Sequence, residues 1–232
     1  MKKKHKYQMT MSLNVLKHLG IKLYSNIPAV LSEVVANAWD ADAEKVDIKI
    51  DKNKITVSDD GLGMTVQESN AKYLLVGYDR RSQKGEAITP KHKRRVMGRK
   101  GIGKLSLFSI AKTIEVHSMK DKEKHGFVMN ADAIEKLLEA QDNQVYYPKE
   151  IPASKVALKS LGTKIVIKDL KKGIKYVRTA LRKRIARRFS IIGANTNFSV
   201  SIDGKPISIE DRDYFHKVQY LWYFGKDGKK IY

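Results

Sequence analysis

Three polar side chains recur at helical spacing within the segment EVVANAWDADA, residues 33–43. Glu33 and Asn37 are four residues apart, and Asp40 follows three residues later. At about 100° per residue, one stripe of a helix would present a carboxylate, an amide and a second carboxylate. A carboxylate can act as a general base, and an amide oxygen can ligate a hard cation. A solvated polar face is the simpler alternative, but the apolar residues around the stripe argue against full exposure.

Two glycine-containing segments have the composition of ligand-binding loops. SDDGLGM, residues 58–64, lets the backbone approach a flat ligand, and Asp59 can accept a hydrogen bond from an exocyclic amine. MGRKGIGK, residues 97–104, offers N–H groups to a phosphate just before an expected helix. Its spacing matches neither a P-loop nor a Rossmann fingerprint. Each segment alone is a weak signal, and the alternative for the first is an ordinary Asp-Gly turn.

The elements that must position these residues follow from apolar periodicity and turn residues. Helices are expected over 28–41, from about 104 to 111, and over 174–189. Strands are expected over 46–50, 54–58, 113–118, 126–130 and 163–168, with a hairpin of 198–202 and 206–209. Thr163 opens one of these strands and on its own would be an ordinary strand residue. Because hairpins link the strand pairs, we expect an α+β two-layer sandwich with helices on one face of a mixed or antiparallel sheet.

The expected domain covers residues 1–210. The polar segment 65–97 would be a long connection of the kind that forms lids. Residues 211–232 are rich in aromatic side chains and would begin a following region or form a packed extension.

Composition restricts the class of protein. The chain has 232 residues, 42% hydrophobic and 31% charged, as in an ordinary globular domain. It has no cysteine, which excludes disulfides, thiol catalysis and cysteine-based metal sites. There is no apolar run near ~20 residues and no signal-peptide pattern, so we expect no membrane span and a cytoplasmic location.

Positive charge is concentrated in the second part of the chain. The net charge is +21, and residues 91–232 carry 32 Lys or Arg against 14 Asp or Glu. The densest clusters are KHKRR at 91–95 and the basic faces of the helix within 178–188. These clusters favour contact with DNA or RNA, and the alternative is a solvated basic surface.

In their order along the chain, four segments resemble the nucleotide-binding motifs of the GHKL ATPase superfamily. This superfamily includes gyrase B, MutL, heat-shock-chaperone ATPases and histidine kinases, and its ATP-binding domain has the Bergerat fold. EVVANAWDADA looks like the N-box, SDDGLGM like the adenine box, MGRKGIGK like the second glycine box, and LGTKI like the final G-T motif. The resemblance covers about residues 10–170 and implies an Mg²⁺-dependent ATPase.

The resemblance also implies roles for individual residues. Glu33 would be the general base, Asn37 would ligate Mg²⁺, and Asp40 would line the site near the nucleotide. Asp59 would accept a hydrogen bond from the adenine amine, with support from Thr163. The remaining residues would lie beside the base (Gly61, Gly63, Met64) or around the phosphates (Gly98, Lys100, Gly101, Ile102, Gly103, Lys104).

The branch of the superfamily decides the expected function. About 25 residues precede the N-box, which disfavours histidine kinases, whereas Glu33 and LGTKI favour the chaperone, MutL, gyrase and MORC groups. No motif supplies the cation that gyrase- and chaperone-like enzymes receive on the γ-phosphate from a following domain. Either a residue such as Lys104 or an arginine of 174–189 substitutes for it, or the cation lies beyond this chain. Two functions stay open: a slow, ATP-driven, nucleotide-dependent homodimeric clamp on DNA, and a chaperone-like or regulatory ATPase acting on protein.

Overall fold

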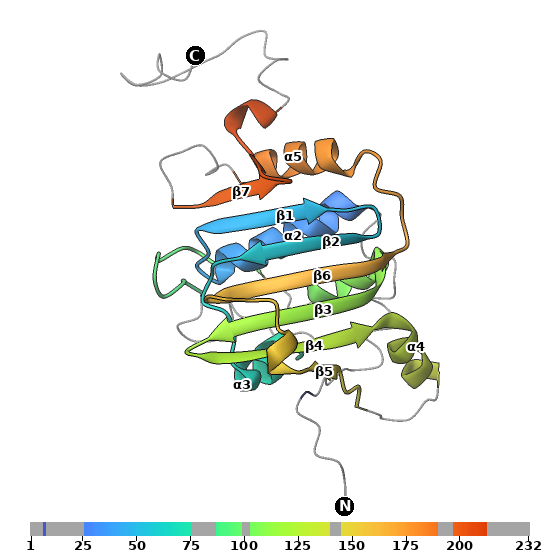
Figure 1. Ribbon diagram of the computed structural model, residues 1–232. Coiled ribbons are helices and arrows are strands. Elements are labelled where there is room, and N and C mark those ends of the chain that lie inside the picture. The colour runs from blue at the N-terminus through green and yellow to red at the C-terminus, as the bar shows by residue number, and fades with distance from the viewer. Residues whose placement is uncertain are drawn as a thin grey trace, which may run out of the picture.

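One mixed sheet of eight strands forms the frame of the described residues, in the order β5-β4-β3-β6-β2-β1-β7-β8 (Figure 1). The computed structural model describes residues 7, 26–75, 87–98, 103–139, 145–189 and 197–212. The strands are β1 (Lys45–Ile50), β2 (Lys54–Asp59), β3 (Ala111–Lys120), β4 (Glu123–Asn130), β5 (Lys149–Ile151), β6 (Gly162–Leu170), β7 (Ser199–Ile202) and β8 (Lys205–Pro206). Neighbouring strands are antiparallel except β1 and β7, which are parallel.

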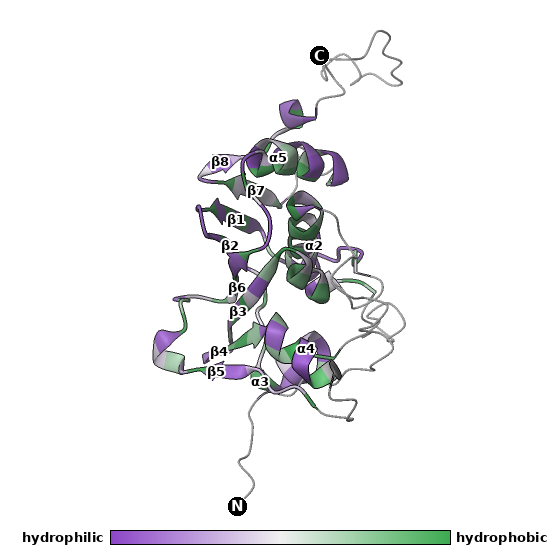
Figure 2. Cartoon of the chain, turned by 90° about the vertical axis from the view of Figure 1, so that its right-hand side faces the viewer, coloured by the Kyte–Doolittle hydropathy of each residue, from purple (hydrophilic) through white to green (hydrophobic). Residues whose placement is uncertain are grey.

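The main helices lie on one side of this sheet, as Figure 2 shows for α2, α4 and α5. They are α2 (Ile27–Asp40), α3 (Val66–Glu68), α4 (Ala131–Glu139) and α5 (Val177–Arg188). Shorter turns are the π-helix η1 (Ser69–Tyr73) and the 3₁₀ helices η3 (Gly103–Ser109), η4 (Ala153–Lys155) and η5 (Ile209–Asp211). The α+β sandwich with helices on one face of a mixed sheet is therefore confirmed. No helix of the described part is long and apolar enough to cross a bilayer.

A single buried cluster joins the helices to the sheet. The apolar stripe of α2 includes Val30 and Leu31, and that of α5 includes Leu181 and Ile185; all four are fully buried. They share the cluster with inward-facing strand residues such as Ile48. Burying a side chain of this kind contributes about 1.5–3 kcal/mol. α2 is therefore held rigidly, and the polar residues on its other side have defined positions.

The expected helix from 104 to 111 is instead the 3₁₀ helix η3, and Ala111 already belongs to β3. Serine hydroxyls account for the tighter turn. Ser106 donates a hydrogen bond to the Gly103 carbonyl, and Ser109 donates one to the Ser106 carbonyl, each three residues back. Such local side-chain bonds compete with the regular helical pattern.

The C-terminal elements are close to expectation but shorter. α5 begins at Val177 rather than at residue 174. The hairpin turn has φ of 49° at Asp203 and 77° at Gly204, as a type I′ turn requires. β8 contains only two residues, and a 3₁₀ helix starts at Ile209, inside the expected second strand.

The expected lid, residues 65–97, has structure at both of its described ends. Thr65 and Glu68 form a capping box that starts α3, and the π-helix η1 follows. At the other end, Ile88 and Arg95 form an antiparallel bridge. Residues 76–86 of the expected lid lie outside the described residues.

Candidate nucleotide site

The polar residues on the stripe of α2 differ in how far they are exposed to solvent. Asn26 caps the helix by accepting a hydrogen bond from the Ala29 N–H at 2.9 Å, and Pro28 occupies the first turn. Farther along the helix, Glu33 is half-buried, Asn37 is exposed and Asp40 is buried. The helix thus presents an accessible amide between two carboxylates, as the spacing predicts.

Asp40 anchors the start of the second glycine segment. Its Oδ1 accepts a hydrogen bond from the Met97 N–H at 2.6 Å, and its Oδ2 accepts one from the Gly98 N–H at 2.8 Å. A Cβ atom at Gly98 would lie 3.0 Å from Oδ2, so a side chain there would crowd this contact. Asp40 therefore supports the loop, and the sequence did not distinguish this role from a direct contact with a nucleotide.

Glu33 lies at the other end of the same segment. A Cβ atom built at Gly103 would be 3.8 Å from Glu33 Oε2. The other carboxylate oxygen, Oε1, accepts a hydrogen bond from Arg188 Nη1 at 2.7 Å. Both ends of the glycine segment thus lie against α2. The intervening predicted site residues, Lys100, Gly101 and Ile102, lie outside the described residues.

The adenine-box residues lie where β2 and β6 pair. Asp59 is the last residue of β2 and is directly opposite Thr163 in the antiparallel register. Its carboxyl is partly buried and accepts a hydrogen bond from the Gly61 N–H at 3.0 Å. Burial raises the pKa of the Asp59 carboxyl to about 7, while the N–H groups of Gly61 and Thr163 favour its charged form. A partly buried acceptor of this kind suits an amine donor.

Close backbone contacts explain the glycines of this box. A Cβ atom at Gly61 would lie 2.7 Å from the Ala41 carbonyl oxygen. Gly63 has φ of 63°, and a Cβ atom there would lie 2.2 Å from the Met119 carbonyl oxygen. The loop therefore packs tightly on α2 and β3 at these positions.

Several supporting residues were missed in the sequence. Ser118 Oγ accepts a hydrogen bond from the Met64 N–H at 2.8 Å and donates to the Gly162 carbonyl at 3.4 Å. Asp42 Oδ2 accepts one from the Lys91 N–H at 2.8 Å, which ties the KHKRR segment to the end of α2. Asp42 could have been noticed inside the N-box and Gly162 inside LGTKI, but Ser118 has no local signal.

Lys104 has a different environment from the one expected. It is buried, and its Nζ donates hydrogen bonds to the Leu75 carbonyl at 2.6 Å and the Lys72 carbonyl at 3.2 Å. Burial lowers the pKa of Lys104 to about 7. The amine thus holds the end of the π-helix η1, and its contact with a phosphate stays a prediction.

Many of the basic side chains have internal partners. Arg178 pairs with Asp203 at 2.6 Å, and Arg182 pairs with Asp211 at 2.7 Å. In the KHKRR segment, Arg94 is buried and donates to the Ala43 carbonyl at 2.5 Å. Its guanidinium also lies 4.3 Å from the centre of the Trp39 ring. The clusters predicted as a nucleic-acid surface therefore serve partly to hold the domain together.

Comparison with known proteins agrees with this geometry. Residues 24–163 match the model of the family described as histidine kinase-, DNA gyrase B- and HSP90-like ATPase. The chain belongs to this family. The matched range contains α2, both glycine boxes, β2 and the first two residues of β6, and domains of the family generally bind ATP and are ATPases.

Relatives of this family member differ in their named activities. The chain is 43% identical over 97% of its length to a provisionally assigned type II restriction enzyme, HgiDII of Herpetosiphon aurantiacus, and it covers 36% of that protein. It is 30% identical over 54% of its length to the chaperone HtpG of Campylobacter jejuni, covering 24% of it. It is 27% identical over 77% of its length to the mismatch repair protein MutL of Rickettsia bellii, covering 28% of it. The chain thus spans roughly a quarter to a third of these relatives.

Proposed function

We propose that this chain is the Mg²⁺-dependent, slowly ATP-hydrolysing domain of an ATP-driven clamp that acts on DNA. The observation that carries the proposal is the way α2 flanks the second glycine segment. Asp40 binds the Gly98 N–H at one end, and Glu33 lies beside Gly103 at the other. A triphosphate bound along that segment would lie next to a carboxylate and to the amide of Asn37.

The adenine ring would bind at the ends of β2 and β6. Asp59 would accept a hydrogen bond from the exocyclic amine, which favours adenine over guanine. Thr163, opposite Asp59 in the sheet register, would support this contact directly or through water. Gly61, Gly63 and Met64 would lie beside the base. The close backbone contacts of these glycines fix the loop beside Asp59, which supports this assignment.

The phosphates and the metal would lie along α2. Asn37 is exposed, and its amide oxygen is the hard ligand that Mg²⁺ accepts. When bound, the ion would neutralise charge on the phosphate oxygens. Glu33 would orient and deprotonate the attacking water. The segment from Gly98 to Lys104, which includes Lys100, Gly101 and Ile102, would surround the phosphates.

Action on DNA is supported by the names of two relatives, a restriction enzyme and a mismatch repair protein. The net charge of +21 favours an anionic partner and so also supports action on DNA. In such a clamp, nucleotide binding would close a homodimer around the substrate. An arginine or lysine for the γ-phosphate would come from this chain or from a partner domain.

A chaperone-like or regulatory ATPase acting on protein is the second candidate. The observation that favours it is the similarity to HtpG over about half of the chain. Salt dependence separates the two functions. A clamp on DNA should bind duplex DNA, and a plot of the logarithm of its binding constant against the logarithm of the salt concentration should have a slope of about −0.9 per neutralised phosphate. A protein-directed ATPase should show no such binding at low salt.

Two substitutions on α2 test the catalytic assignment. Glu33→Ala should bind ATP normally but lose hydrolysis by about 10²–10⁴-fold, because the general base is removed. Asn37→Ala should instead weaken Mg²⁺-dependent ATP binding. Glu135→Ala, which removes an α4 carboxylate, is the matched control and should behave as wild type. Hydrolysis by Glu33→Ala at the wild-type rate would rule out Glu33 as the base.

A further inference from the structure

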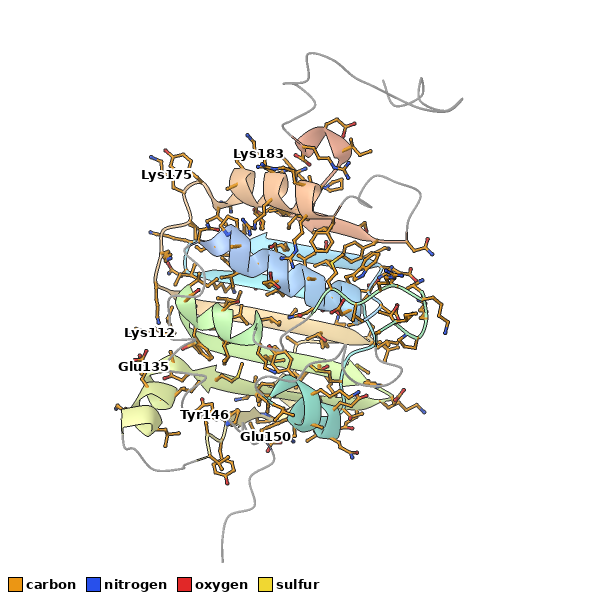
Figure 3. The ribbon with its side chains drawn as sticks, turned by 180° about the vertical axis from the view of Figure 1, so that it is seen from behind. Lys112, Glu135, Tyr146, Glu150, Lys175 and Lys183 are labelled. Atoms are coloured by element: carbon orange, nitrogen blue, oxygen red, sulfur yellow. The ribbon has the colours of Figure 1, made fainter. Side chains whose placement is uncertain are left out.

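A basic groove runs between the first turn of α2 and the helix α5 with the loop before it. It has a volume of about 1070 Å³ and is called the α2–α5 groove below. No carboxylate occurs among the described residues that line it. Figure 3 shows Lys175 and Lys183 at this edge of the molecule, away from Lys112 and Glu135 near α4. The cations lining the groove are Lys172, Lys175, Lys183, Arg184, Arg187 and Arg188.

The groove also offers an aromatic surface. Tyr176 lines it and is 73% exposed, the largest exposed fraction among the large hydrophobic residues of the described chain. Lys175 Nζ lies 5.3 Å from the centre of its ring. Ile27 and Pro28 add apolar lining at the first turn of α2. A positively charged groove with an exposed aromatic ring is the arrangement that binds single-stranded nucleic acid, through phosphates and base stacking.

Arg188 connects this groove to Glu33. Its Nη1 donates hydrogen bonds to Glu33 Oε1 and to Ser32 Oγ, each at 2.7 Å. Ser32 is fully buried, and Arg184 Nε lies 3.4 Å from the same hydroxyl. Among the described residues, Arg188 Nε and Nη2 have no acceptor, so the guanidinium retains donors for a phosphate. One side chain can thus contact the groove's ligand and Glu33 at once.

We propose that the α2–α5 groove binds the phosphodiester backbone of single-stranded nucleic acid and that Arg188 transmits its occupancy to Glu33. This inference rests on the proposed function, in which Glu33 is the general base. A phosphate on the remaining donors of Arg188 fixes the guanidinium. The guanidinium then holds Glu33 Oε1, so that Oε2 stays directed toward Gly103 and the attacking water. Arg188 is therefore a positioning residue, and nucleic acid in the groove raises the rate of ATP hydrolysis.

The test follows oligonucleotide binding and ATP hydrolysis with the 232-residue chain. Fluorescence anisotropy with a labelled single strand of about 20 nucleotides, longer than the ~4–16 that a typical single-strand site covers, measures affinity across salt concentrations. Wild type should bind, and the oligonucleotide should raise hydrolysis severalfold. Replacing Lys183 and Arg187 by Glu should weaken binding at least about 10-fold and reduce the salt slope by about 1.4, or 0.7 per lost phosphate contact. Stimulation should be lost with it.

Arg188→Lys separates binding from coupling. Lysine keeps the positive charge. Its single ammonium group, however, cannot bind a phosphate and Glu33 through separate nitrogens, as a planar guanidinium can. This variant should bind the oligonucleotide within about 3-fold of wild type, since one phosphate contact keeps its charge, yet lose the stimulation. Its ATP affinity, measured in parallel, reports that the nucleotide site is folded. The control Lys136→Glu with Lys155→Glu changes the same charge near the β5 edge and should match wild type in both assays.

The outcomes distinguish the inference from the proposed function. If wild type does not bind or hydrolyse ATP, the proposed function fails. If ATP is hydrolysed but the oligonucleotide binds equally well to the Lys183 and Arg187 double variant, the groove assignment is overturned. Unchanged stimulation in Arg188→Lys overturns the coupling. Tighter binding of duplex, or equal displacement by polyglutamate of matched charge, overturns the assignment to single-stranded nucleic acid.

Discussion

The candidate nucleotide site and the basic helix α5 were both prominent in the sequence, but they differ in what the structure does with them. Around the site, Asp40 and Asp59 contact backbone N–H groups within the predicted loops. On α5, Arg178 and Arg182 pair with carboxylates 25 and 29 residues away in the chain. The order of the motifs had already grouped Asp40 with a loop 57 and 58 residues away, whereas no motif indicated the carboxylate partners of the α5 arginines.

The first prediction concerns a substitution that disrupts a close backbone contact at the site, and it has the largest expected effect on stability. Gly162 has φ of 134°, and a Cβ atom there would lie 2.0 Å from the Asp59 carbonyl oxygen. Gly162→Ala should therefore destabilise the fold by roughly 3 kcal/mol or more, because strain and a backbone clash add. Thermal or urea unfolding measures the change.

Gly173→Ala is the matched control for that substitution. Within the described part of the chain, and apart from its two sequence neighbours, no atom lies within 4 Å of the Cβ position at Gly173, and its φ is not in the left-handed range. Its free energy of unfolding should stay within about 0.5 kcal/mol of wild type. Equal effects of the two substitutions would show that the strand-end contact is not as close as described.

The second prediction compares a cation of α5 that has internal partners with an exposed cation just before the helix. Arg182 donates two hydrogen bonds to Asp211 and further ones to the carbonyls of Lys205 and Pro206. Arg182→Ala should cost about 1–3 kcal/mol, because it removes the charged donor of a partly buried carboxylate. Lys175→Ala, at an exposed position before the helix, should change stability by less than about 0.5 kcal/mol. Equal stability of the two variants would mean that Arg182 is only solvated.

The third prediction concerns pH and Asp59. A pKa of about 7 in the folded state, above the ordinary 3.8, means that the folded chain binds more protons between these values. Stability without nucleotide should therefore fall as pH rises from about 4 to 7, and the loss should be complete above that range. Asp59→Asn removes this loss and should therefore be more stable than wild type at pH 8.

Well below pH 3.8 the two proteins should have the same pH dependence at this site, because Asp59 is then protonated in both the folded and the unfolded state. Chemical unfolding at pH 4, 6 and 8 tests the sign. A wild type that gains stability from Asp59 ionisation between pH 4 and 7, relative to the variant, would contradict the raised pKa.

Much of the fold was accessible from the sequence because its signals are local. The apolar stripe of α2, the alternation in β1 and the Asp203-Gly204 turn each predict an element that the structure confirms. The 3₁₀ helix after Gly103 was missed, because serine side-chain bonds outweigh the helical pattern there. The short strand β5 and the helix α4 were also not predicted. β5 contains only three residues, too few for an alternation pattern.

The sequence provides a set of candidate site residues but not their geometry. The order of the motifs identified Glu33, Asp40 and Asp59 as candidates. In the structure these residues lie beside Gly103, Gly98 and Gly61, respectively. The supporting contacts of Ser118 and Arg188 depend on pairings across 54 and 155 residues, which have no local signature. Long-range contacts of this kind follow only from the folded topology.

The most direct test of the account is isothermal titration of the chain with ATP and Mg²⁺ at pH 8, for wild type and Asp59→Asn. The account predicts that wild type binds ATP and that the variant binds at least about 10-fold more weakly, because an NH₂ donor replaces one of the two carboxylate oxygens that can accept from the adenine amine. The variant should at the same time be the more stable protein without nucleotide, which excludes misfolding as the cause. Equal ATP affinity in the two proteins, or no binding by wild type, would contradict the assignment of this site.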